Sequence, residues 1–76
     1  KHFARLTIER MLNDRRFTQR EREVIVLAFM GLTYAGIAER LFITEHTVKK
    51  RLESIRRKTG TGSFFELFMQ HVPKEE

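Results

Sequence analysis

The sequence has no cysteine, no tryptophan, one proline and four glycines among its 76 residues. Without cysteine the chain can form neither a disulfide nor a thiolate zinc site, so its fold must depend on a packed core. No apolar run approaches the roughly 20 residues that cross a bilayer, and no signal peptide is visible. The sequence therefore predicts no membrane partner and a cytoplasmic setting. It also shows no sustained alternation of period two, so no strand is predicted.

Patterns typical of catalytic and metal sites are missing as well. His2, His46 and His71 are scattered, and none stands beside a plausible nucleophile or in the H-E-x-x-H spacing that binds zinc. We expect His46, near the start of a helix, to face solvent or a phosphate rather than to act as a base. The sequence therefore predicts neither an enzyme nor a cofactor.

The apolar content and the charge distribution are more informative. Apolar residues make up 41% of the chain and include seven phenylalanines, enough for one modest core. Residues 45–59 hold six Lys and Arg against two Glu, whereas residues 17–44 are balanced. Such an excess suggests a polyanionic partner, with nucleic acid favoured over an anionic membrane. A solvated helix face is the alternative explanation.

The chain is predicted to begin with a short amphipathic helix over residues 2–12, which Asn13-Asp14 ends. The inner face of this helix is predicted to carry Ala4, Ile8, Met11 and Leu12. Because the chain begins with Lys rather than Met, we expect residues 1–16 to be a helix and linker continuing from an upstream region.

Capping signals predict the next two helices. Thr18 and Glu21 have the S/T-x-x-E spacing of a capping box, and Gly31 ends the helix that they open. Thr33 is then placed to cap a short helix over residues 34 to about 41. A short helix in this place is typical of the first half of a helix-turn-helix.

Two further helices follow. Thr44 caps a longer helix over residues 45–59, and Gly60 stops it. Residues 63–66 form another S-x-x-E box, which opens a last helix that ends before Pro73. The chain is thus predicted to be all-helical, with a three-residue turn before its longest and most basic helix.

The helix predicted over residues 45–59 is amphipathic in an unusual way. Its inner face is predicted to consist of Val48, Leu52, Ile55 and Thr59. The residues predicted to point away from the core are Lys49, Lys50, Glu53, Arg56 and Arg57. A helix about 10–12 Å across fits the major groove of B-DNA, which is about 12 Å wide. The apolar face would hold the helix on its scaffold, and the basic face would meet phosphates and base edges.

A set of residues at fixed spacings carries a family resemblance. The segment begins with FTQREREV, continues with GLT and IAERLFITEHTVK, and ends with IRRKTG. Over residues 17 to about 70 this pattern resembles the DNA-binding domain of the LuxR-type (NarL/FixJ-type) bacterial transcription regulators. The matching residues are Thr18, Arg20, Glu21, Glu23, Val24, Gly31, Leu32, Thr33, Ile37, Ala38, Leu41, Ile43, Thr44, Thr47, Val48, Lys49, Ile55, Lys58 and Gly60.

The resemblance implies an all-α fold, a four-helix bundle containing the helix-turn-helix, to which the helix over residues 2–12 is an addition. It implies a DNA-binding domain over residues 17–72 and a tail over residues 73–76. Such domains bind double-stranded DNA sequence-specifically, as the C-terminal part of response regulators or of small-molecule-sensing activators. Transcription regulation at the bacterial nucleoid is therefore implied, and RNA polymerase stays open as a further partner.

The resemblance also implies roles for individual residues. Lys49, Lys50 and Glu53 lie where family members reach base edges; a Lys can donate to guanine, and a Glu can accept from cytosine. The residues implied to bind backbone phosphates are Thr33, Thr44, Thr47, Arg56, Arg57 and Lys58. For the threonines, helix capping alone is the alternative role. At Ala35-Gly36 the chain departs from the family's usual Lys-Glu, which removes one common phosphate contact.

The last helix carries more apolar residues than one stripe needs. Leu67 is predicted to close the core, and a second apolar stripe would remain exposed. We expect this stripe to form a homodimer contact through Phe64, Phe65, Phe68 and Met69. The alternative is that the helix over residues 2–12 covers it.

Two other functions remain open at this stage. Region 4 of sigma factors also contains an REREVI-like helix and a helix-turn-helix, but it lacks the Thr-Val-Lys spacing. A helix-turn-helix that has lost DNA and binds a protein partner through the Phe-rich last helix is the other alternative. Salt dependence separates the protein-binding alternative from DNA binding, because phosphate neutralisation makes log K fall with log[salt] at a slope near −0.9 per contact.

Overall fold

The computed structural model describes the backbone of residues 2–74 and the side chains of residues 4–74; the tail predicted for residues 73–76 thus lies partly outside the described residues. Every regular element in this part of the chain is a helix, as predicted. In chain order they are α1 (His2–Leu12), α2 (Gln19–Phe29), α3 (Tyr34–Leu41), α4 (Glu45–Thr59) and α5 (Phe64–Gln70).

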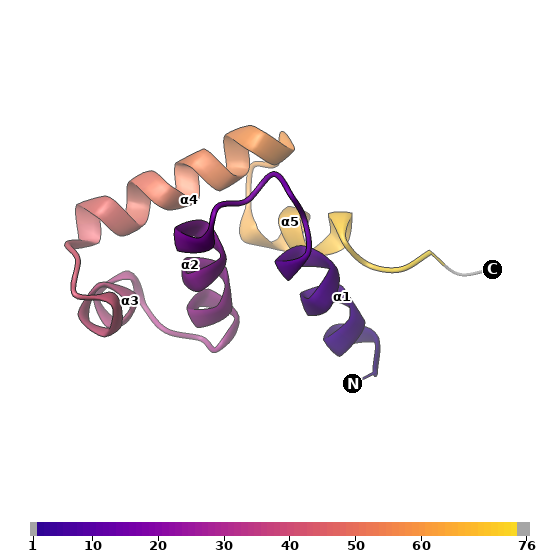
Figure 1. Cartoon of the computed structure of the whole chain (residues 1–76), viewed down its shortest axis with the longest axis horizontal. Helices are drawn as coiled ribbons and strands as arrows, with labels where there is room; N and C mark the ends of the chain where they lie inside the picture. The colour runs from indigo at the N-terminus through magenta and orange to yellow at the C-terminus, as the bar shows by residue number, and fades with distance from the viewer. Residues whose placement is uncertain (1, 75–76) are drawn as a thin grey trace.

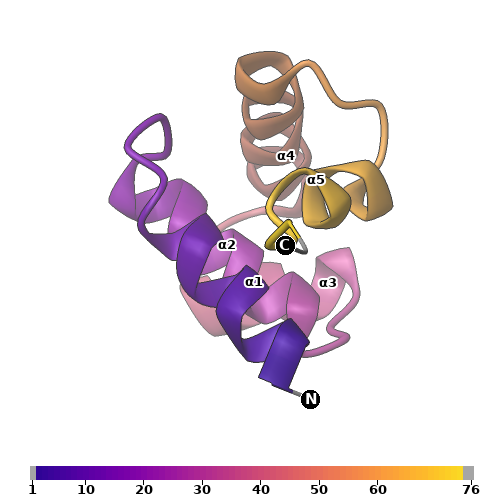
Figure 2. The same ribbon diagram turned by 90° about the vertical axis from the view of Figure 1, so that its right-hand side faces the viewer.

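The helices are arranged around α4, the longest of them. In Figure 1, α4 runs along the top of the molecule, with α3 below its N-terminal end and α2 below its middle. Helices α1 and α5 contact each other at the opposite end, where α5 also contacts α4 (Figure 2). Helices α3 and α4 thus form the helix-turn-helix, and α2 and α5 pack against α4.

The predicted caps explain where the helices begin. Thr18 and Glu21 form a reciprocal capping box: the Thr18 hydroxyl accepts from the Glu21 N–H, and the Glu21 carboxylate accepts from the Thr18 N–H. At Ser63 the predicted box is only half formed. The Ser63 hydroxyl accepts from the Glu66 N–H at 3.1 Å, but the Glu66 carboxylate accepts from the Gly62 N–H at 2.8 Å instead.

Left-handed residues end three of the helices. Gly31 after α2 (φ +89°) and Gly60 after α4 (φ +70°) take this conformation without the steric penalty of a Cβ atom. Phe42, which ends α3, has φ +58° and is 95% exposed. A left-handed non-glycine residue costs roughly 1–2 kcal/mol, so the turn between α3 and α4 is held by the packing on both sides of it.

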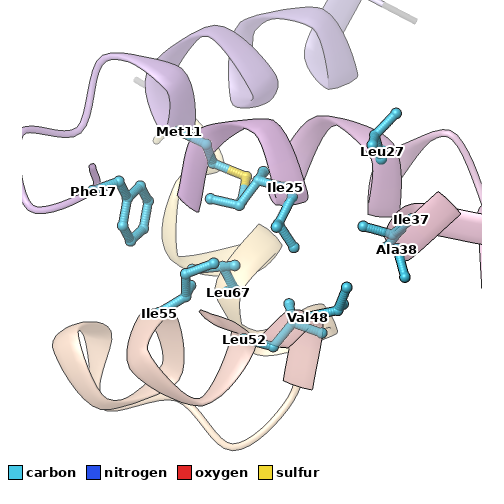
Figure 3. Close-up of a cluster of buried hydrophobic side chains, with 11 residues drawn as sticks. Met11, Phe17, Ile25, Leu27, Ile37, Ala38, Val48, Leu52, Ile55 and Leu67 are labelled. Atoms are coloured by element: carbon cyan, nitrogen blue, oxygen red, sulfur yellow. The ribbon is translucent and has the colours of Figure 1, made fainter. Parts of the chain in front are cut away.

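One hydrophobic core joins the five helices (Figure 3). The predicted inner face of α4 is confirmed, because all four of its residues are buried. Helix α5 contributes Leu67, as expected, with 1% of its surface exposed. The core residues are Met11, Phe17, Val24, Ile25, Leu27, Ile37, Ala38, Val48, Leu52, Ile55 and Leu67.

The inner face of α1 differs from the prediction. Ala4 is exposed, and the buried residues are Thr7 and Met11. These two are four residues apart and therefore share one face of the helix, which the sequence pattern of apolar residues alone did not identify because Thr7 is polar. Helix α1 thus contributes to the same core as the helix-turn-helix.

A polar cluster ties the segment after α1 to α5 and to the end of α4. The Asp14 carboxylate binds Arg16 at 2.6 Å and His71 Nε2 at 2.8 Å. Arg16 also donates to the carbonyl of Lys58 and to the side chain of Gln70. The hydrogen bond from Arg16, joined by that from His71, holds the pKa of Asp14 well below its ordinary value despite opposition from burial. The sequence predicted Asn13-Asp14 only as a helix end.

Candidate nucleic-acid interface

The outward face of α4 is basic and unpaired. Lys49, Lys50, Glu53 and Arg57 are exposed, as the sequence predicted. Within residues 4–74 none of these four side chains forms an ion pair with another residue. The three cations are therefore available to an external polyanion, and binding it would break no internal salt bridge.

The N-terminus of α4 presents a second polar feature. The Thr44 hydroxyl accepts from the Thr47 N–H at 3.1 Å and lies 3.0 Å from the Thr47 hydroxyl. Thr44 thus caps the helix, as the capping alternative requires, and Thr47 supplies the N–H group that it accepts. The first N–H groups of any helix have no acceptor within it, and the positive end of the helix dipole favours an anion there. The cap and a phosphate contact are therefore compatible at this end.

The N-terminus of α3 lies against the same side of α4. Thr33 caps α3 by accepting from the Gly36 N–H at 3.1 Å. The next residue, Tyr34, places its ring under the ammonium of Lys49, with 5.8 Å between Nζ and the ring centroid. The start of α3 is thus linked to Lys49 on the basic face of α4.

Arg56 does not share the outward face, and this part of the prediction is wrong. Its residue is only half-exposed, and its side chain lines a small cavity of about 220 Å³ together with Tyr34, Leu52 and Phe64. The reason is helical geometry: Arg56 follows the buried Leu52 by four residues, so it lies beside the inner face rather than opposite it. A phosphate at Arg56 would have to approach from the flank where α3 begins.

Lys58 lies on the other flank and has an internal partner. Its ammonium binds the nearly buried carboxylate of Glu21 at 2.8 Å, and Ser54 donates to the other oxygen of that carboxylate at 2.7 Å. Burial raises the pKa of Glu21, but the bonds from Lys58, Thr18 and Ser54 outweigh it and hold this pKa below its ordinary value. Lys58 therefore fastens α4 to α2, a role that the sequence did not reveal.

The four apolar residues singled out on α5 divide into two pairs. Phe64 and Phe68 are half-buried, and their rings pack on Phe29 of α2 at centroid distances of 4.9 and 5.2 Å. Phe65 and Met69 are 71% and 50% exposed. The surface left free on α5 is therefore narrower than the sequence suggested, and Phe65 and Met69 are its centre.

No helix in the described part of the chain is both long enough and apolar enough to span a bilayer.

Comparison with known proteins places the chain in a family. Residues 15–70 match the family described as "Bacterial regulatory proteins, luxR family". The chain is also 44% identical over 66 residues to the transcriptional regulatory protein YdfI of Bacillus subtilis (strain 168). That alignment covers 83% of this chain but 31% of the relative, so the chain spans about a third of the relative's length.

No solved structure gives a significant match. The family match nevertheless covers most of the chain, and it includes the whole helix-turn-helix and the basic helix α4. The resemblance seen in the sequence is thereby confirmed. The chain belongs to the luxR family of bacterial regulatory proteins, a family of DNA-binding regulators and not of enzymes.

Proposed function

We propose that this chain binds double-stranded DNA sequence-specifically, with α4 lying in the major groove. Lys49, Lys50 and Glu53 read base edges in this proposal, because all three are exposed on the outward face of the helix. The observation that carries the proposal is the outward face of α4, on which exposed cations stand free of internal ion pairs, as described above. These exposed cations stabilise no internal contact through an ion pair. Their clustered positive charge attracts a polyanion, so it points to a nucleic-acid partner.

Phosphate contacts are proposed on both sides of this face. Thr33, Thr44 and Thr47 mark the two helix N-termini, whose N–H groups and dipoles favour phosphate oxygens. Arg57 reaches the backbone from the exposed face, and Arg56 from its flank. Lys58 uses one of its three ammonium protons for Glu21, which leaves two for a phosphate on that side.

We further propose that the chain acts as a homodimer through α5. Phe65 and Met69 support this, because both are exposed and lie four residues apart on one face of the helix. A two-fold dimer would present two copies of α4 to two half-sites of an operator.

The protein to which the chain belongs is proposed to be a bacterial transcription regulator acting at the nucleoid in the cytoplasm. The relative YdfI supports this by its name, a transcriptional regulatory protein. A role as the output domain of a response regulator, and a contact with RNA polymerase, belong to the same proposal.

The salt dependence of binding tests the proposal. Duplexes selected by the chain from a random pool should bind with an affinity that falls as log[salt] rises, at a slope of about −0.9 per phosphate contact. Fluorescence anisotropy of labelled duplexes at several salt concentrations would measure it. A flat response, or no sequence enriched from the pool, would contradict the proposal.

A protein-binding module is the second candidate function. It rests on the exposed aromatic rings, Phe65 on α5 and the 95% exposed Phe42 in the turn before α4. The same titration separates the two, because a chain that binds only protein would show no salt-dependent uptake of DNA. The family match is to luxR regulators and does not support the sigma-factor alternative.

A further inference from the structure

Tyr34 lies at the point where α3 meets the basic face of α4. It is the first residue of α3, directly after the cap residue Thr33, and 38% of its surface is exposed. The Lys49 ammonium stands 5.8 Å from the centroid of its ring, within the range of a cation–π contact. Lys49 is also one of the residues proposed to read bases. The contact therefore connects Tyr34 of α3 to a proposed base-reading residue of α4.

Two carboxylates could have taken the place of the ring. Glu45 and Glu53 lie four residues before and four residues after Lys49, the spacing at which Glu and Lys form ion pairs on a helix. In the described part of the chain neither of them pairs with Lys49. The Lys49 side chain is thus turned toward α3 rather than along its own helix.

Apolar residues of neighbouring helices lie close to Tyr34. Tyr34 lines the small cavity between α2, α3, α4 and α5, with Leu32, Leu52 and Phe64 among its neighbours. Tyr34 is 38% exposed, and the rest of its surface is covered by the protein. A tyrosine ring turns about only two side-chain torsions, whereas a free lysine side chain samples many rotamers, so the ring can serve as a platform for the ammonium.

We propose that Tyr34 is a positioning residue that presents Lys49 to the base edges and keeps it away from Glu45 and Glu53. The proposal rests on the proposed function, in which Lys49 reads a base pair. An exposed cation–π contact corresponds to a factor of about 2–5 in an equilibrium constant. Loss of the ring should therefore lower the preference for the base pair read by Lys49 by about 2- to 5-fold, without an equal loss on every duplex.

A double-mutant cycle on the whole chain tests this. Tyr34→Leu removes the ring, and Tyr34→Phe, its matched control, keeps it. Each would be made alone and together with Lys49→Ala, and its affinity measured for the selected duplex and for duplexes altered at one base pair. We expect Tyr34→Phe to keep the preference, Tyr34→Leu to lower it at the Lys49-dependent pair, and Tyr34→Leu to lower it no further in the Lys49→Ala background.

Two results would overturn the inference. One is a uniform loss of affinity on all duplexes in Tyr34→Leu; the other is the same loss of preference with and without Lys49. Thermal unfolding of each variant would identify a loss that came from misfolding, and the comparison of Tyr34→Leu with and without Lys49 then separates positioning of Lys49 from a general loss of structure. If the unaltered chain failed to prefer any duplex, the proposed function would fall first, a result distinct from failure of Tyr34 alone.

Discussion

Single residues on α4 divide between holding the helix and facing outward. Lys58 and Ser54 bind Glu21 on α2, whereas Lys49 and Lys50 have no internal ion pair in the part of the chain described. The two groups should therefore respond differently to substitution: Ser54 should affect stability, Lys49 and Lys50 should affect binding, and Lys58, which is also proposed to bind phosphate, should affect both.

The residue that most directly tests base reading is Lys49. Lys49→Ala should reduce discrimination between the selected duplex and its variant at one base pair by about 1–3 kcal/mol, if the ammonium bonds to guanine. Arg57→Ala is the matched control, because an exposed phosphate contact should weaken all duplexes about equally. Competition binding with single base-pair variants measures both. An equal loss on specific and random DNA for Lys49→Ala would remove it from the base-reading residues.

The two internally bonded carboxylates predict how stability depends on pH. Asp14 and Glu21 have pKa values below their ordinary values in the folded chain, so the unfolded chain takes up protons first as the pH falls. Their stabilisation is present above about pH 4.5 and is lost as the pH drops through the folded pKa values.

Thermal unfolding followed by circular dichroism between about pH 6 and pH 3 would measure this loss. The transition temperature should fall less steeply in Asp14→Asn and in Glu21→Gln than in the unaltered chain. Glu53→Gln, which removes an exposed carboxylate without an ion pair, should keep the original slope. A decline that was equally steep in all four proteins would show that other groups cause it.

At the scale of the helices, the sequence determined a great deal. Each cap residue and each end glycine acts through its own local hydrogen bonds and dihedral angles, so Thr18, Thr33, Thr44 and Gly60 could be assigned without knowledge of the fold. What could not be predicted depends on partners distant in the chain. Glu21 meets Lys58 across 37 positions and Asp14 meets His71 across 57, and no periodicity records such pairs.

The same distinction applies to the candidate site. The outward positions of Lys49, Lys50 and Glu53 follow from helical spacing, and the structure agrees with it. Arg56 was predicted to point outward because the buried face of α4 was expected to be narrower than it is. In the structure Arg56 lies at the edge of that face, beside Leu52. Tyr34 was missed because its significance comes from α4, and nothing in the sequence around it indicates that neighbour.

Helix α3 contains a glycine that local geometry does not require. Gly36 lacks a positive φ, and a Cβ atom built there would lie 3.5 Å from Leu32 and from the Thr33 hydroxyl, which is ordinary contact. Gly36→Ala should therefore raise the free energy of unfolding by about 0.5–1 kcal/mol. Urea unfolding measures the change.

The matched control for this prediction is Gly60, whose φ of +70° disfavours any side chain. Gly60→Ala should lower the free energy of unfolding by about 1–2 kcal/mol. A loss of stability in Gly36→Ala as well would indicate that the start of α3 cannot accommodate even a methyl group.

At the scale of the whole molecule, the proposed homodimer through α5 can be tested directly. If α5 forms the dimer, Phe65→Ser combined with Met69→Ser should shift the chain toward monomer, because the exposed apolar pair at the centre of the contact is lost. Sedimentation equilibrium measures the association constant. Phe42→Ser removes an even more exposed ring outside α5 and should leave association unchanged. A chain that sediments only as monomer at high concentration would contradict the dimer.

The N-terminal helix lies upstream of the segment that matches the family, yet it is built into the same interior. Met11 of α1 is fully buried in the common core, α1 contacts α5, and the Asp14–His71 bond follows immediately. Rotation of α1 would therefore have to uncover Met11 or carry α5 with it. A movement imposed on this end of the chain would therefore be felt both at the proposed subunit contact on α5 and, through Arg16 and the carbonyl of Lys58, at the end of α4.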